Sequence, residues 1–225
     1  MKPVKKTISL KEYSEIPIIA SIRYDPKKKS YVMTERGRES KRRGLIGNLK
    51  RTYYPTYVRA AKKYRKRSKK GSSEAQGVNV ENQLTMYVAK RKAPTHRMAK
   101  AVLKYWKDHG HNPIAAQVPV YIDKFKCCTQ ADIITQTSDG QLWMNELKTG
   151  YPTAGFTKKG TFENLLEVPN TIYNQYHLQA YYTTKGMRDM GLNIKCVLIQ
   201  VYDDKQKVVV KSRKQPKWIQ QLELE

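Results

Sequence analysis

Asp132, Glu146 and Lys148 are the side chains in this sequence whose types and spacing best suit chemistry. Asp132 lies in an apolar run, and Glu146 and Lys148 follow fourteen and sixteen residues later, separated only by Leu147. Alternate residues of a β-strand point to the same face, so Glu146 and Lys148 should lie together if their segment is a strand. The Asp-Gly pair in the intervening turn at 137–140 favours a hairpin, which would bring Asp132 beside them.

Two carboxylates that converge in this way repel each other unless a cation lies between them. Because Mg²⁺ prefers carboxylate, carbonyl and water oxygens, the pattern indicates a divalent metal site at Asp132 and Glu146. The ammonium group of Lys148 can orient a water molecule or stabilise charge on an attacked phosphate. The alternative is that Asp132 is a strand-end residue and that Glu146 and Lys148 form a surface ion pair, since Glu-x-Lys alone is common.

The segments around these residues are predicted to form both helices and strands. Apolar positions recur at helical spacing in two parts of the chain, with Gly or Pro residues near their ends. Shorter apolar runs between turn residues favour strands. We expect helices at 78–88, 95–108 and 170–187, and strands at 117–122, 125–135, 141–147, 195–201 and 207–211. The resulting order of α, β, β, β, α, β, with additional pieces, indicates an α/β fold.

Positive charge is concentrated in the first 70 residues. The chain of 225 residues carries 44 Lys and Arg against 19 Asp and Glu, a formal net charge of +25. Residues 1–70 hold 23 of the basic and 5 of the acidic residues, a net charge of +18. Such a surplus points to a polyanionic partner, first of all nucleic acid. We therefore expect a basic N-terminal extension at 1–70 and a second domain at 71–225.

The densest basic cluster spans residues 59–70. Its helix-forming composition suits a contact along a phosphate backbone, and the tyrosines at 53, 54, 57 and 64 are expected to be stacking surfaces for bases. The alternatives for this run are a nuclear-import signal and a solvated tail. The basic side chains expected to contact nucleic acid are Lys62, Lys63, Arg65, Lys66 and Arg67.

Composition argues against several protein classes. No apolar run approaches the ~18 residues of a membrane span, and the first residues lack the apolar segment of a secretion signal. The three cysteines, two of them adjacent, make neither a disulfide framework nor a zinc quartet. We therefore expect an intracellular protein without membrane contact. The sequence leaves open whether it acts in a nucleus, an organelle or a virus- or phage-infected cell.

The arrangement of Asp132, Glu146 and Lys148 resembles the PD-(D/E)XK nuclease superfamily. That superfamily has a restriction-endonuclease-like αβββαβ core, a mixed central sheet flanked by helices, with Asp on one strand and Glu-x-Lys on the next. Residues 74–211 look most like the RecB and lambda-exonuclease branch, which adds an acidic residue on an upstream helix and a Gln-rich helix downstream. Glu81 resembles the upstream residue, and the segment 174–182 resembles the downstream motif.

The downstream motif departs from the family pattern. RecB-like proteins usually have Gln followed four residues later by Tyr, whereas the fourth residue after Gln179 is Thr183, and Tyr182 comes one position early. Iron–sulfur members of the branch carry four cysteines around the core. This chain has three, at unsuitable spacings, so no cluster is expected.

The resemblance implies a metal-binding or catalytic role for each matched residue near the acidic pair. Asp132, Glu146 and the Leu147 carbonyl would hold Mg²⁺ or Mn²⁺, with Glu81 as a further direct or water-mediated ligand. Lys148 would position the attacking water for hydrolysis of a phosphodiester.

The Gln-rich helix would face the same site. Gln175 and Gln179 are four residues apart and can lie on one face of a helix, where they would contact phosphate or order Lys148. Tyr176 and Tyr182 would stack on, or hydrogen-bond to, the strand being cut. The alternative is a core-packing helix whose glutamines face solvent.

The sequence therefore predicts a metal-dependent deoxyribonuclease in recombination, repair or replication, with an exonuclease favoured over an endonuclease by the resemblance alone. DNA is the expected partner, and RNA, cleavage polarity and oligomeric state are left open. One alternative is a non-catalytic nucleic-acid-binding protein, which needs only the basic extension. Another is a structure-selective endonuclease, such as a junction resolvase or a transposon end-cutting enzyme.

Overall fold

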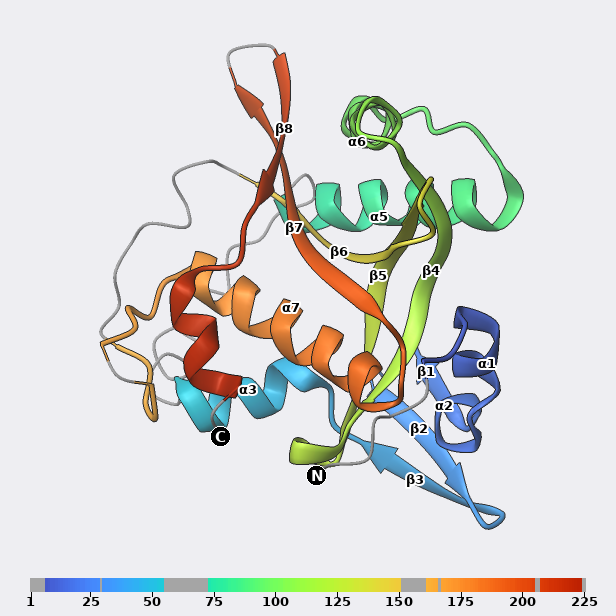
Figure 1. Ribbon diagram of the computed structural model, residues 1–225, viewed down its shortest axis with the longest axis vertical. Coiled ribbons are helices and arrows are strands. Elements are labelled where there is room, and N and C mark those ends of the chain that lie inside the picture. Colours follow the sequence, from blue (N-terminus) through green and yellow to red (C-terminus); the bar gives the residue numbers. More distant parts are fainter. Residues whose placement is uncertain are drawn as a thin grey trace.

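The computed structural model describes residues 7–28, 30–54, 73–150, 161–165, 167–204 and 207–223, without the side chains of residues 73 and 74. Its N-terminal part contains α1 (Leu10–Glu15), α2 (Pro17–Ala20), β1 (Ile22–Asp25), β2 (Ser30–Glu35), β3 (Arg38–Arg42) and α3 (Leu45–Tyr53). Two helices follow, α5 (Ser73–Lys90) and α6 (Arg97–Asp108). The remaining elements are β4 (His111–Ile122), η2 (Asp123–Phe125), β5 (Cys127–Thr137), β6 (Leu142–Thr149), α7 (Ile172–Asp189), β7 (Ile194–Asp204), β8 (Lys207–Arg213) and η3 (Lys217–Glu223) (Figure 1).

The central sheet has five strands in the order β4-β5-β6-β7-β8. β5 runs antiparallel to both of its neighbours, β4 and β6. β6 and β7 are parallel, and β8 returns antiparallel to β7. The turn between β5 and β6 is closed by a hydrogen bond from the Gly140 N–H to the Thr137 carbonyl, at 2.9 Å. A parallel pair needs a crossover connection, and α7 lies in the connection from β6 to β7.

Helices α5 and α6 cover one face of this sheet. Val80 and Leu84 of α5 and Trp106 of α6 are buried in one apolar cluster with Ile133 of β5 and Leu147 of β6. Since neighbouring residues of a strand point to opposite faces, the residues on either side of Ile133 and Leu147 belong to the other face.

Helix α7 covers the opposite face. Leu178 and Met187 are buried in a second apolar cluster with Val120, Ile134 and Met144 from β4, β5 and β6. Figure 1 shows α7 lying across the sheet beside β7. The prediction of an α/β fold with a mixed central sheet flanked by helices is therefore confirmed.

The described part of residues 1–70 packs into the same core as α7. The Tyr13 hydroxyl donates a hydrogen bond to the Pro119 carbonyl at 3.0 Å, and Leu49 is fully buried in the α7-side cluster. Tyr53 and Tyr54, expected to be stacking surfaces for bases, are only 1% and 3% exposed, so that expectation is wrong for these two. The expected tyrosines at 57 and 64 and the basic cluster at 59–70 lie outside the described residues.

Helices α5 and α7 are the longest of the described helices, with 18 residues each. Neither these two nor any other helix in the described ranges is long and apolar enough to cross a membrane. Both instead bury apolar side chains against the central sheet.

Gly186 of α7 lies directly against β4. A Cβ atom at this position would meet the Tyr121 carbonyl oxygen and Val120 Cγ1, each at 2.7 Å. We expect Gly186→Ala to lower the free energy of unfolding by about 1–3 kcal/mol, because the helix must move away from the sheet. Denaturant unfolding followed by circular dichroism measures the change. In the control Gly47→Ala, a Cβ in α3 meets nothing within 4 Å and should be neutral or stabilising; equal losses in both variants would contradict the close packing.

Candidate functional site

Asp132 and Glu146 lie where β5 and β6 stop pairing. The ladder between these strands runs from Gln136 opposite Leu142 to Ile133 opposite Asn145, and one more step in this register would place Asp132 opposite Glu146. Instead, Asp132 Oδ2 accepts a hydrogen bond from the main-chain N–H of Leu147, at 2.8 Å. The structure thus brings the Asp132 carboxylate against the main chain between Glu146 and Lys148, as the sequence spacing indicated.

Glu146 and Lys148 lie on the same side of β6 and form an ion pair. Lys148 Nζ donates to Glu146 Oε1 at 2.5 Å. The Glu146 side chain is fully buried and that of Lys148 is 20% exposed, so this is not the surface pair of the alternative interpretation. The second oxygen of Glu146, Oε2, is buried and has no hydrogen-bond partner within the described residues. Such an atom bears a large desolvation penalty, which a cation or another donor would offset.

Glu81 reaches the same region from α5, where it is held by Gln117 of β4. Gln117 Nε2 donates to Glu81 Oε1 at 2.6 Å. Pairs of Ala116 with Ile133 and of Val118 with Ala131 bracket Gln117 and Asp132 on the two strands. Gln117 has φ +53°, a left-handed conformation that is strained for a residue with a side chain and that often occurs at functional sites.

The pKa values of the three acidic residues show that their charges interact. Burial raises the pKa of Glu146 to about 7, and the negative charges of Asp132 and Glu81 add to this effect while Lys148 opposes it. Burial also raises the pKa of Asp132 and that of Glu81, the latter with a further contribution from the charge of Asp132. Burial alone would lower the pKa of Lys148, but the charges of Glu146 and Asp132 outweigh burial and raise it. Lys148 is therefore a permanent ammonium group.

A cavity of 330 Å³ opens beside Glu81 and Lys148. Its wall includes Tyr176 of α7, whose ring lies under the Lys148 ammonium, 5.1 Å from the ring centroid to Nζ. Gly77 of α5 also lines the cavity, and a Cβ there would lie 2.5 Å from Thr149 Oγ1. The absence of a side chain at Gly77 lets α5 approach β6 closely enough for Glu81 to face the cavity.

The oxygen donors at the site are of the type that binds a hard divalent cation, but they are not arranged around one position. Carboxylate oxygens are the preferred ligands of Mg²⁺ and Mn²⁺, and Glu146 Oε2 is a buried oxygen without a donor among the described residues. No group of three His, Cys, Asp or Glu side chains in the described ranges has the arrangement of a ready metal site. Since Lys148 occupies Glu146 Oε1, a cation would compete with the ammonium group for this carboxylate. The residues present therefore fit a divalent cation only with movement of their side chains.

The residues predicted on the Gln-rich helix do not all lie at the acidic site. Tyr176 contacts Lys148, whereas Gln175 Nε2 donates to Asn170 Oδ1 at 2.7 Å, within α7's own N-terminal region. Gln179 is partly buried, and its side chain makes no hydrogen bond within the described residues. Tyr182 is 1% exposed and its hydroxyl shares a hydrogen bond with the Tyr53 hydroxyl. Because no surface of Tyr182 is left for a nucleic acid strand, it is a core residue rather than the expected contact.

Sequence reasoning missed the polar contacts that hold β6 from the α5–α6 side. The buried Asn145 accepts a hydrogen bond from Trp106 Nε1 at 3.0 Å and donates to Thr135 Oγ1 at 3.0 Å. These contacts fix β6 next to Glu146. An Asn immediately before Glu-x-Lys, in an otherwise apolar strand, was the available signal. For Gln117, which holds Glu81, the sequence offers no comparable signal, because its role depends on a local left-handed backbone.

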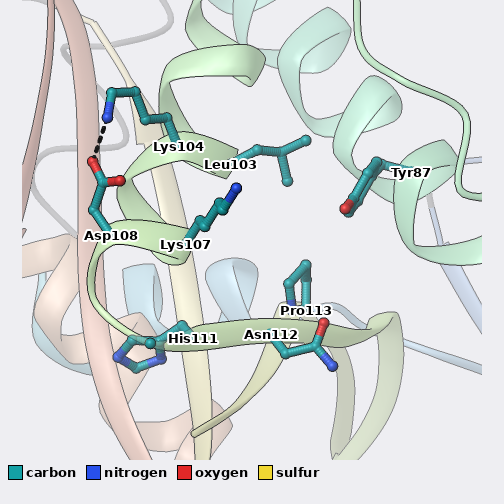
Figure 2. Close-up of a pocket in the computed structure, with 9 residues that line it drawn as sticks. Tyr87, Leu103, Lys104, Lys107, Asp108, His111, Asn112 and Pro113 are labelled. Atoms are coloured by element: carbon teal, nitrogen blue, oxygen red, sulfur yellow. Dashed lines mark hydrogen bonds and ion pairs between the residues drawn. The ribbon is translucent and has the colours of Figure 1, made fainter.

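A separate cavity of 640 Å³ lies between the end of α6 and the start of β4. Figure 2 shows Tyr87 and Leu103 on one side of it and His111 and Pro113 on the β4 side, with the ion pair of Lys104 and Asp108 at its edge. None of the four residues of the acidic site lines this cavity. None of its lining residues has an orphaned buried polar atom among the described parts of the chain, so it is a weaker candidate centre than the acidic site.

No family model matches this chain, and no curated protein matches it. The case for its function therefore rests on the geometry described above.

His177, beside Tyr176 on α7, is a core residue. It is 1% exposed and packs edge-on against Tyr173, with ring centroids 4.4 Å apart. Burial, with a smaller contribution from the positive charge of Arg213, lowers the pKa of His177 to about 4. The imidazole is therefore neutral in the folded protein at neutral pH.

This burial predicts a pH dependence of stability. Between pH 6.5 and about 4 the unfolded chain takes up a proton at His177 and the folded chain does not, so the stability present above pH 6.5 is lost as the pH falls. The loss should reach about 3 kcal/mol. Urea unfolding at several pH values measures it, and His177→Gln should flatten the slope in this window. An unchanged slope in the variant would show that other groups cause the acid sensitivity.

Proposed function

We propose that this chain is a metal-dependent nuclease that hydrolyses DNA phosphodiester bonds. The observation that carries the proposal is the position of Asp132, whose carboxylate binds the main chain between Glu146 and Lys148 at the point where β5 and β6 separate. Two acidic residues from adjacent strands and an ammonium group are thus gathered in a buried setting. This is the chemistry needed to hold a divalent cation and a scissile phosphate together.

The element order supports a restriction-endonuclease-like core. α5, β4, β5, β6, α7 and β7 follow one another in the order α, β, β, β, α, β, with α6 inserted after the first helix and β8 added at the sheet edge. The acidic residues occupy the second and third strands of this series, and Glu81 comes from its first helix. These are the positions that the PD-(D/E)XK resemblance implies.

The residues of the site have different roles in this proposal. Asp132, Glu146 and the Leu147 carbonyl would hold Mg²⁺ or Mn²⁺, with Glu81 as a further direct or water-mediated ligand. A divalent cation supplies a water of lowered pKa and neutralises charge on the phosphate. Lys148 keeps its proton, because its pKa is raised. In this scheme it acts as a positive group that orients a water or a phosphate oxygen.

Tyr176 restricts where that ammonium group can go. Its ring lies 5.1 Å from Lys148 Nζ, and a cation over an aromatic face is attracted by the ring's negative potential. If Glu146 bound a divalent cation in place of Lys148, this contact would keep Nζ next to the cavity. Tyr176 is a positioning residue in this scheme.

Charge supports DNA as the substrate. A net charge of +25 favours a polyanion at long range, and an intracellular role in recombination, repair or replication suits such a nuclease. We propose an exonuclease in first place, because the predicted similarity is to exonucleases, and a structure-selective endonuclease in second.

A non-catalytic nucleic-acid-binding protein is the candidate from another class. It is favoured by the ion pair between Lys148 and Glu146 and by the lack of a ready three-ligand metal group among the described residues. In that case the charge would bind DNA, and the acidic site would have only a structural role.

Cleavage assays separate these candidates. We expect wild-type protein to cut end-labelled DNA with Mg²⁺ and not with EDTA. Glu146→Gln and Lys148→Ala should each reduce the rate by about 100-fold or more, since each removes charge that acts on the reacting groups, while DNA binding measured without Mg²⁺ is retained.

The exposed pair of Lys185 and Asp189 gives a matched control. Its two side chains are 2.9 Å apart and 42% and 45% exposed. Lys185→Ala and Asp189→Asn therefore remove the same kinds of charge from an exposed ion pair outside the acidic site, and they should leave cleavage unchanged. Equal residual cutting in all four variants would assign the activity to a contaminant and exclude this site.

The form of the substrate separates exonuclease from endonuclease. An exonuclease needs a free end, so we expect linear duplex to be degraded and a covalently closed circle to remain intact under the same conditions. Gel analysis of a time course with both substrates measures this. Cutting of the circle at a rate similar to that of the linear DNA would favour the structure-selective endonuclease.

A further inference from the structure

A third cavity, of 680 Å³, lies between the N-terminal sheet, α3 and β5. Its walls come from β1, β2 and β3, from the first turn of α3 and from Thr129 of β5. Four of its lining residues are basic, Lys28, Lys41, Arg42 and Arg43, and none is acidic. We call this cavity the basic pocket. Its lining has the opposite sign of charge to the carboxylates of the candidate site.

Two of these cations are not neutralised. Lys28 Nζ lies 3.7 Å from Asp25, and Arg42 lies 3.3 Å from Glu35. Lys41 and Arg43 have no ion-pair partner within the described residues, and both are exposed. The pocket therefore retains positive charge that a bound anion would neutralise.

The basic pocket also contains two buried donors without acceptors. Ser30 is 6% exposed, and its Oγ is buried with no hydrogen-bond partner in the described parts of the chain. Arg42 Nε is likewise buried without a partner there. Leaving a buried donor unpaired carries a penalty of about 1–3 kcal/mol each in ordinary proteins, and a ligand with several acceptor oxygens would offset it.

The start of α3 adds main-chain donors to the same cavity. Gly44 is the N-cap residue and provides no side-chain hydrogen bond to the first turn. Gly44, Leu45, Ile46 and Gly47 all line the pocket, and of these the Gly47 N–H is already bound to the Gly44 carbonyl at 3.2 Å. Helix N-termini carry a partial positive charge and free N–H groups that favour phosphate. Together with Ser30 and Arg42, they form a donor set suited to a tetrahedral oxyanion.

An aromatic pair lines the pocket. The rings of Tyr24 and Tyr31 are 5.1 Å apart and inclined by 47°, and Tyr24 is 38% exposed. Beside them, Ile46 is 46% exposed. An exposed ring next to a phosphate-binding cavity suits an unpaired base, since stacking on an aromatic side chain does not depend on base identity.

The basic pocket adjoins the carboxylates through Tyr31 and β5. Thr129, which lines the pocket, lies three residues before Asp132 on the same strand. Burial raises the pKa of the Tyr31 hydroxyl, and the negative charge of Asp132 makes a small contribution in the same direction. Residues three apart on a strand point to opposite faces, so Thr129 fixes the distance of the pocket from Asp132 along β5, about 10 Å, but not a shared face.

We propose that the basic pocket binds one nucleotide unit of a single-stranded segment of DNA, with its phosphate on Ser30, Arg42, Arg43 and Lys41 and its base on Tyr24. The inference deepens the proposed function and rests on it in one respect, namely that the strand held in the pocket is the strand presented to Asp132 and Glu146. The pocket is then the subsite that sets the position of the DNA relative to the acidic site.

The experiment measures the binding of fluorescently labelled oligothymidylate to the full chain in EDTA, so that no cutting occurs, across a range of salt concentrations. The double variant Lys41→Gln/Arg43→Gln should bind at least about tenfold more weakly, and the slope of log affinity against log salt should fall by about 0.7 for each lost phosphate contact. The matched control is Lys90→Gln/Lys100→Gln, which removes two exposed cations of α5 and α6 outside the basic pocket. An identical loss of affinity in the two double variants would overturn the proposal.

Ser30→Ala and Tyr24→Leu test the pocket without a change of charge. Ser30→Ala removes an unpaired hydroxyl, so thermal stability should be equal or higher, while affinity for the oligonucleotide falls about threefold or more. Tyr24→Leu should weaken binding by about fivefold or more, because it keeps an apolar side chain but loses stacking. Wild-type affinity in both variants would overturn the assignment of phosphate and base to these residues.

Cleavage measured in parallel keeps this inference distinct from the proposed function. If both hold, the Lys41→Gln/Arg43→Gln variant with Mg²⁺ cuts slowly at low DNA concentration and recovers at saturating DNA. If wild-type protein never cuts but the pocket variants still lose binding, the pocket stands and the nuclease proposal fails. If wild-type protein cuts and the pocket variants bind and cut as the controls do, the pocket fails alone. Preferential pocket-dependent binding to vesicles of anionic lipid, with no effect on DNA, would assign the pocket to a membrane surface and overturn the proposal.

Discussion

The burial of three carboxylates beside one ammonium group is the constraint on which the site depends. Lys148 acts on Glu81, Asp132 and Glu146 together, and in each case its positive charge opposes the rise in pKa. Burial outweighs this effect, so the pKa of all three carboxyl groups stays raised. Removing an ion from water costs several kcal/mol even after relaxation. An arrangement that gathers such groups without neutralising them is therefore poor for stability and suited to a function that brings further positive charge.

The fold maintains this arrangement from both faces of the sheet. On the α5–α6 face, Asn145 ties β6 to Trp106 and Thr135, which fixes the strand where its next residue is Glu146. On the α7 face, Tyr176 limits the position of Lys148. The separation of β5 from β6 beyond Ile133 and Asn145 leaves the Leu147 N–H free of the hairpin ladder, and the Asp132 carboxylate takes it. The acidic site is thus a consequence of where one ladder ends.

Much of the site was predictable because short-range rules determine it. The Asp-Gly turn sets the β5–β6 hairpin, and the spacing of Asp132, Glu146 and Lys148 then follows from strand geometry. β4, by contrast, begins at His111, six residues before the expected start. The strand was predicted to start later because Asn112-Pro113 is typical of a helix end. Proline is tolerated there since β4 is an edge strand with a register shift after Pro113. Tyr53 and Tyr182 are buried by residues distant in sequence, including Phe162 and Phe125, which no local pattern reveals.

The opposite charges of the acidic site and the basic pocket suggest why binding and chemistry would be separated in this chain. The phosphates of a DNA strand are repelled by buried carboxylates, so the affinity for DNA has to come from elsewhere on the surface. Coulomb attraction between the pocket and the phosphates is largely screened beyond a Debye length, about 10 Å at 0.1 M salt. Thr129 of the pocket lies about 10 Å along β5 from Asp132, on the opposite face of the strand. On the proposed function, a divalent cation at Asp132 and Glu146 would then remove the repulsion locally, so that substrate approaches the carboxylates only when the group needed for hydrolysis is present.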